Sequence, residues 1–153
     1  AGRLVKRIRG SFAQHVAASR AFGHLAAAFL GLGQQSIAEE LTAARVAFQK
    51  SAFPRRSGVY AWTLESLADL RLRHMGCPPS VLLETPRKQA CLRPFLNGEL
   101  ARRAAEQALP LYQEAAGLLR MLFGEDHAYH RDVASKGEAL RSALADVAPW
   151  LFD

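Results

Sequence analysis

The sequence predicts an all-helical protein. Half of its 153 residues are hydrophobic, and the β-branched residues that favour strands are sparse. Apolar residues recur at three- and four-residue spacing along several segments, which is the period of an α-helix that buries one face. Glycine and proline fall between these segments and separate them. A chain of this length fits one domain with a real hydrophobic core.

Residues 1–20 predict a basic amphipathic helix or arm. Large apolar residues recur at every fourth position from Leu4 to Val16, so they share one helix face. The segment has no acidic residue, and the basic residues of the arm are Arg3, Lys6, Arg7 and Arg9. Three interpretations remain open: the edge of an organelle transit peptide, an arm on RNA or an anionic membrane, or a first helix packed on the domain. The apolar row favours the packed helix.

The next elements are predicted from apolar spacing and helix-end signals. A second helix is expected from Phe22 to Gly33. Ser36 and Glu39 form a capping box that opens a third helix. Pro54 and the residues after it predict a loop. A fourth helix is expected over Val59–Met75, with Gly76 ending it.

The second half of the chain predicts broken helices, then two long ones. Prolines interrupt residues 77–98, and a helix is expected over 99–107. Pro110 predicts a kink or a helix start near the beginning of the following helix. Gly124 is expected to end that helix, and Asp126 to cap the last one. The C-terminal Trp-Leu-Phe is expected to pack back on the preceding helices.

The stretch 108–127 carries the most specific motif. The residues that form this motif are Ala108, Leu111, Tyr112, Ala115, Gly124, Asp126 and His127. This pattern resembles the second helix of a kinesin light chain-type tetratricopeptide unit, and the helical tail of SET and MYND domain proteins has a similar ending. Leu67-Ala68 follows Leu25-Ala26 by the period of such units. Arg45, Arg71 and Ala128 depart from the family pattern.

The resemblance implies antiparallel helix pairs stacked as a short tetratricopeptide-like superhelix over residues 21–153, after the arm 1–20. Such arrays bury a continuous core and leave a concave face. The SET and MYND catalytic elements are absent from the sequence, so this likeness implies no methyltransferase activity.

The net charge of +6 belongs mostly to the N-terminal segment. Residues 1–37 have five basic and no acidic residues, whereas residues 38–153 have 15 basic and 14 acidic ones. A uniformly basic RNA-binding surface would distribute its charge differently. Contact with RNA or anionic lipid is therefore expected at the arm only. No segment predicts a transmembrane helix.

The densest polar cluster includes His127 and His130, which offer metal-ligand chemistry with nearby carboxylates. A structural role in the turn is the stronger interpretation, because no third and fourth ligand is evident. Cys77 and Cys91 form no CxxC pair and are expected to be free thiols in an intracellular protein. No nucleophile or phosphate-loop motif is present. The sequence therefore predicts no catalytic residue, metal or cofactor.

We expect a non-enzymatic protein–protein interaction module or scaffold. Its predicted partner-binding stripe lies on one helix and comprises Trp62, Glu65, Asp69 and Arg73. Tryptophan and arginine often anchor interfaces, although simple edge packing of Trp62 is an equal alternative. Two other functions stay open: a structural subunit of a large organellar assembly, such as a mitochondrial one, and a small metal-dependent enzyme using His127 and His130. The expected compartment is an organelle, such as the mitochondrion, or the cytoplasm.

Overall fold

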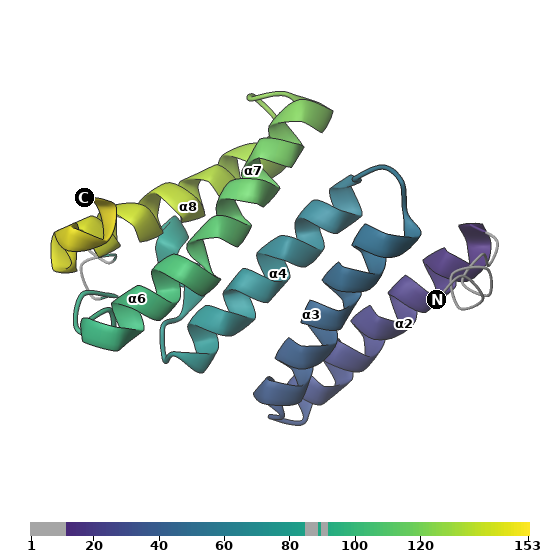
Figure 1. Cartoon of the computed structure of the whole chain (residues 1–153), viewed down its shortest axis with the longest axis horizontal. Helices are drawn as coiled ribbons and strands as arrows, with labels where there is room; N and C mark the ends of the chain where they lie inside the picture. The colour runs from purple at the N-terminus through teal and green to yellow at the C-terminus, as the bar shows by residue number, and fades with distance from the viewer. Residues whose placement is uncertain (1–11, 85–88, 90–91) are drawn as a thin grey trace. The chain divides into compact units, whose positions relative to one another are not determined.

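The computed structural model describes residues 12–84, 89 and 92–153, and these residues form an all-α fold without strands. The chain divides into two compact units, Ala1–Arg56 (unit 1) and Ser57–Asp153 (unit 2). Figure 1 labels the helices. They are α2 (Phe12–Gly31), α3 (Gln35–Ala52), α4 (Gly58–His74), α6 (Gly98–Gln107), α7 (Leu109–Phe123) and α8 (Ala128–Val147), with short 3₁₀ helices η1 (Pro79–Leu83) and η3 (Pro149–Phe152).

Unit 1 is a helical hairpin of α2 and α3. A turn of three residues joins the helices, and Gly33 in it has φ of +77°. The backbone amide of Gln34 donates to the carbonyl of Phe29 (2.9 Å), which closes the turn. Because a positive φ is costly for residues with a Cβ, glycine suits this position. The predicted glycine turn is confirmed.

Two predicted helix starts in unit 1 are wrong. A separate helix was expected to begin at Phe22, but α2 runs unbroken from Phe12. Gly23 lies inside it, and one glycine costs a helix only about 1 kcal/mol. The capping box is also absent, because the N-cap of α3 is Gln34, which makes no side-chain cap. Ser36 already lies inside α3, since the Gly33 turn directs the chain into the helix earlier.

The α2–α3 interface has a polar centre. Arg45 Nε and Gln49 Nε2 both donate to the Ser19 hydroxyl, at 3.2 and 3.1 Å. A Cβ on Gly23 would lie 2.7 Å from Arg45 Nη1, so the missing side chain provides the space for the guanidinium. Burial lowers the pKa of Arg45. Arg45, which departs from the repeat pattern, therefore has a structural role here, because its side chain reaches across to α2.

Aromatic rings close the other end of the hairpin. The Phe48 ring lies 6.0 Å from His15, 5.8 Å from Phe22 and 6.4 Å from Phe53, between ring centroids. Phe53 also meets Phe12 edge-on at 5.8 Å. Edge-to-face pairs at these distances are favourable beyond their buried area. The aromatic cluster thus connects the first turns of α2 with the end of α3.

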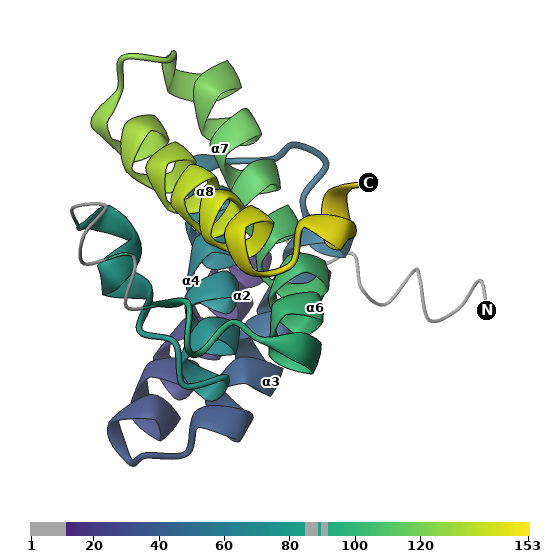
Figure 2. The same ribbon diagram turned by 90° about the vertical axis from the view of Figure 1, so that its left-hand side faces the viewer.

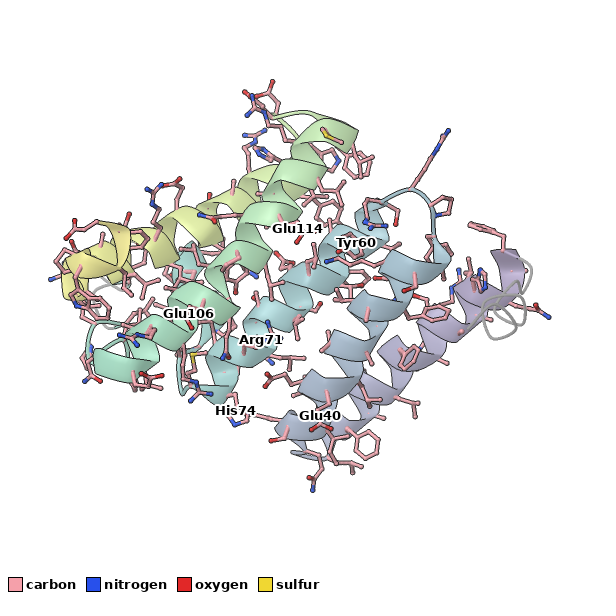
Figure 3. All side chains as sticks on the ribbon, viewed as in Figure 1. Glu40, Tyr60, Arg71, His74, Glu106 and Glu114 are labelled. Atoms are coloured by element: carbon pink, nitrogen blue, oxygen red, sulfur yellow. The ribbon has the colours of Figure 1, made fainter. Side chains whose placement is uncertain are left out.

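Unit 2 is built on three packed helices. α7 packs against both α4 and α8, and Figure 2 shows α7 and α8 side by side with a turn between them. Ser57 caps α4 by accepting from the amide of Tyr60 (3.3 Å). Tyr60 points toward Glu114 of α7 (Figure 3), and its hydroxyl donates to Glu114 Oε1 at 3.3 Å. The predicted helix over 59–75 is confirmed as α4.

A single residue, Ala108, separates α6 from α7. Pro110 lies in the first turn of α7, where its missing amide hydrogen costs least. The kink or helix start predicted near Pro110 is confirmed. Arg71 of α4 donates through Nη1 to the carbonyl of Gln107 (2.9 Å) at the end of α6. A cation there stabilises the helix C-terminus, which explains the arginine at this position.

The remaining segments cover the ends of unit 2. The proline-rich stretch forms η1, which packs on α8. At the C-terminus, Arg102 lies over the Trp150 ring and Arg141 over the Phe152 ring, each 5.5 Å from the ring centroid. These contacts confirm that the C-terminal aromatic residues pack back on the preceding helices.

Candidate functional site

The predicted partner-binding stripe on α4 contains two exposed and two largely buried side chains. Trp62 is 66% exposed, and Arg73 is also exposed. The side chains of Glu65 and Asp69 are only 18% and 23% exposed, and both face α8. A partner can therefore reach Trp62 and Arg73 directly, whereas the two carboxylates are already engaged within unit 2. Partner binding by the stripe stays a prediction.

Lys136 of α8 occupies the space between the two carboxylates. Its ammonium Nζ lies 3.2 and 3.3 Å from the two Asp69 oxygens and 3.4 Å from Glu65 Oε2. The Tyr112 hydroxyl of α7 donates to Asp69 Oδ1 at 2.5 Å. Lys136 also lies 5.9 Å from the centre of the Tyr112 ring. The group joins three helices and holds its own charges together.

Burial affects the pKa of Glu65 and of Tyr112 in this group. It raises the pKa of Glu65, which Lys136 opposes, while Asp69 and Asp132 raise it further. Burial and the nearby Asp69 carboxylate also raise the pKa of the Tyr112 hydroxyl. The phenol therefore keeps its proton and remains the hydrogen-bond donor. These side chains support one another structurally, because each has its partner within unit 2.

Sequence reasoning missed Lys136 and the role of Tyr112 in this group. The available signal was a lysine in the apolar row of the last helix, between Val133 and Leu140. A buried lysine requires an anionic partner. Glu65 and Asp69, four residues apart on α4, were the matching pair. Close packing allows the contact, since a Cβ on Gly137 would lie 3.5 Å from Tyr112 Cβ.

A second site is the exposed apolar surface at one end of unit 2. α4 begins at this end, and α7 stops and α8 starts there (Figure 1). We define the helix-end surface by its large, exposed apolar side chains: Val59, Trp62, Leu122, Phe123 and Tyr129. Tyr129 is 67% exposed and Phe123 is 50% exposed. Clustered apolar exposure of this kind is typical of interaction sites.

Ring stacking connects the parts of the helix-end surface. Phe123 lies against Gly58, because a Cβ there would be 3.2 Å from its ring. The Phe123 ring stacks on His127 at 4.8 Å, and His127 stacks on Tyr129 at 5.5 Å. The row of rings thus joins the first turn of α4 to the first turn of α8.

The turn between α7 and α8 shows how its histidines are used. Gly124 ends α7 with φ of +89°, as predicted. The predicted cap Asp126 is wrong, because His127 is the N-cap of α8 and its Nδ1 accepts from the amide of Tyr129 (3.2 Å). The stacked ring places His127 Nδ1 over the helix start. His130 Nδ1 lies 3.0 Å from the carbonyl oxygen of Glu125.

Other predicted sites have the following positions. Within the described part of the chain, no group of three or more histidine, cysteine or acidic side chains could hold a metal ion. Cys77 is a buried free thiol, and burial raises its pKa to about 11. The arm residues Arg3, Lys6, Arg7 and Arg9, like Cys91, lie outside the described residues. None of the described helices is long and apolar enough to cross a membrane.

Comparison of the chain with models of known protein families, with curated proteins and with solved structures finds no match.

Proposed function

We propose that this chain is a non-catalytic interaction module or scaffold that binds a partner protein through the helix-end surface of unit 2. The observation that carries the proposal is the row of stacked rings from Phe123 to Tyr129, which leaves large apolar side chains in water. The Phe123 ring lies against Gly58, and Trp62, 66% exposed, follows Gly58 by four residues on the same face of α4. Large aromatic side chains in a fixed arrangement contribute most to binding at protein interfaces. The polar group around Lys136 joins α4, α7 and α8 of the same unit through its ion pairs and the Tyr112 hydrogen bond.

We also propose that α2 and α3 form a tetratricopeptide-like helix pair. The support is their hairpin packing and the glycine in the turn, at the position where the resemblance expects it. The stretch 108–127 adds the spacing of its alanines, leucines and tyrosine. In this proposal unit 1 provides the repeat-like helix pair, and the helix-end surface of unit 2 provides the contact.

The test is site-specific photo-crosslinking in the cell of origin. A photoreactive phenylalanine analogue replaces Trp62 in one variant and Tyr129 in another, and Gln113, exposed on α7, serves as the control position. We expect a discrete crosslinked protein from the two surface positions and none from Gln113. Mass spectrometry then identifies the partner and the segment that it contributes.

Binding to the purified partner follows. Trp62→Ser with Tyr129→Ser should weaken binding at least tenfold, because removing a central aromatic anchor typically costs about 2 kcal/mol or more. Gln113→Ser is the matched control and should have little effect. Crosslinks that form equally at Gln113, or binding that survives the double substitution, would show that another surface carries the function.

A further inference from the structure

The loop between α3 and α4 contains two adjacent arginines outside any helix. α3 ends at Ala52 and α4 begins at Gly58, so residues 53–57 connect them (Figure 1). Arg55 and Arg56 lie in this loop, and residues 54–57 are all exposed. The pair also falls where the chain divides, because unit 1 ends with Arg56 and unit 2 begins with the next residue. Exposed loops of this kind are the preferred sites of cleavage by endopeptidases.

The backbone of this loop is held by few hydrogen bonds. The amides of Arg55 and Ser57 donate no backbone hydrogen bond to any described residue, and Pro54 has no amide hydrogen. The chain is extended at both ends of the loop, with φ of −110° and ψ of 126° at Phe53 and φ of −125° and ψ of 171° at Ser57. Local opening of the loop therefore leaves α3 and α4 intact, and an extended chain is the form that a protease cleft binds.

The same dipeptide occurs at Arg102 and Arg103, where the fold protects it. Both residues lie inside α6, between Ala101 and Ala104, which are fully buried. Cleavage at this pair requires α6 to unwind and to expose the two alanines, whereas cleavage in the loop requires neither. The two arginine pairs thus have the same chemistry and differ in access.

One further basic residue of the described part of the chain lies outside the helices. It is Arg93, which forms an ion pair with Asp146 (2.8 Å). Its peptide bond leads to Pro94, and proteases that cut after arginine do not cleave before the proline ring. Arg87 and Lys88 lie outside the described residues. Among the described basic residues, the loop pair is therefore the most accessible to such a protease.

We propose that the Arg55–Arg56 loop is a processing site for an endopeptidase of trypsin specificity. Such an enzyme holds an arginine side chain in a pocket that ends in a carboxylate, and it hydrolyses the peptide bond after Arg55 or the one after Arg56. The reaction consumes one water molecule, so the arginine carbonyl becomes a carboxylate and the next nitrogen becomes an amino group. This inference is independent of the helix-end surface, and either proposal can fail without the other.

The cut releases unit 2 from the basic unit 1. Ser57 stays with unit 2 after either cleavage, and its hydroxyl continues to cap α4 by accepting from the amide of Tyr60 (3.3 Å). The large buried side chains Leu82, Leu140 and Leu144 also belong to unit 2, so the released unit keeps its own core. Contacts made by the charge of unit 1 then no longer hold unit 2 in place.

Limited digestion of the purified full chain tests the access. A small amount of trypsin is added, and intact-mass spectrometry follows the products with time. We expect the first cut within residues 12–153 to give a fragment that begins at Arg56 or Ser57. A first cut at residues 87–88 or at Arg102 and Arg103 would overturn the proposal.

Matched variants locate the cleaved bond. Arg55→Gln with Arg56→Gln should slow formation of the fragment at least about a hundredfold, because a pocket built for a charged group rejects a neutral one. Arg55→Lys with Arg56→Lys should keep the cleavage, since lysine fills the same pocket. Arg102→Gln with Arg103→Gln removes the same charge from α6 and should leave the rate unchanged. An unchanged rate in the loop glutamine variant would overturn the assignment.

The cell of origin decides whether the site is used. An antibody against unit 2 detects the full chain and its fragments, and mass spectrometry gives their first residues. We expect a fragment that begins at Arg56 or Ser57, that is lost in the loop glutamine variant and that persists in the α6 variant. Detection of the full chain alone, or of a fragment that survives the loop glutamine substitutions, overturns processing at this loop.

Discussion

The two units of the chain bury different kinds of residue. The buried side chains of the described part of unit 1 are small or polar: Ser19, Ala26, Ala38, Thr42 and Gln49. Unit 2 buries large apolar side chains in addition to alanines, among them Leu64, Leu72, Leu82, Leu140 and Leu144. The difference teaches that a hairpin with one interface cannot enclose large residues, whereas a third packed helix creates an interior. Stability is therefore expected to be concentrated in unit 2.

The units also differ in charge. Unit 1 has nine basic and two acidic residues, and unit 2 has eleven basic and twelve acidic ones. The basic character of the protein thus belongs to the hairpin and the residues before it. Unit 2 is nearly neutral, so local groups such as Lys136 with Glu65 and Asp69 decide its electrostatic contacts.

The largest expected effect comes from separating the units. A fragment of residues 57–153 should keep its helix content and unfold cooperatively, because its large apolar core lies within it. A fragment of residues 1–56 should lose most of its helix, since one polar interface offsets little of the entropy of ordering two helices. Circular dichroism during thermal unfolding measures both. A cooperative transition in fragment 1–56 would contradict the comparison.

The next effect concerns the charge at the centre of unit 2. Lys136→Met should lower the free energy of unfolding by about 3–5 kcal/mol, because it leaves two half-buried carboxylates without their cation. Denaturant unfolding followed by far-UV circular dichroism gives the value. Adding Glu65→Gln and Asp69→Asn to Lys136→Met should restore much of the loss. If the triple variant is no more stable than the single one, lost packing rather than unpaired charge is the cause.

A smaller effect is expected in the hairpin. Ser19→Ala removes the acceptor of both Arg45 and Gln49 and should destabilise unit 1 by about 1–3 kcal/mol. Hydrogen exchange of the α3 amides measures this locally. Ser51→Ala is the matched control, because Ser51 is exposed and bonds only to its own helix backbone. Equal exchange in both variants would mean that the polar centre contributes nothing to the hairpin.

The smallest effect is a change in pH dependence. Because the folded state raises the pKa of Glu65 above 4.5, the folded protein takes up this proton more readily than the unfolded one. This residue therefore adds stability as pH falls through its folded pKa, and costs stability when ionised at higher pH. The difference in unfolding free energy between the protein and Glu65→Gln should accordingly change between neutral pH and about pH 4.5. A difference that is constant with pH would contradict the assignment.

The sequence by itself determined the all-helical class and most helix ends. Apolar spacing and the scarcity of β-branched residues are local properties, and a helix needs only neighbouring residues for its hydrogen bonds. Gly33, Gly76 and Gly124 were predicted as ends because positive φ is a property of one residue. Pro110 was placed near a break for a similar local reason, since its ring removes one backbone donor.

Only the tertiary structure decided which side chains meet. Ser36 has the sequence pattern of an N-cap, but the path of the turn makes Gln34 the N-cap of α3. Asp126 was predicted to cap α8, but His127, whose ring stacks on Phe123, is the N-cap instead. From the sequence, Glu65 and Asp69 were expected to be surface charges along α4. Their partner Lys136 lies some 70 positions later, and helix periodicity cannot show that it packs opposite them. Helix periodicity gives the face of each residue, whereas the partner of that face depends on packing between segments distant in sequence.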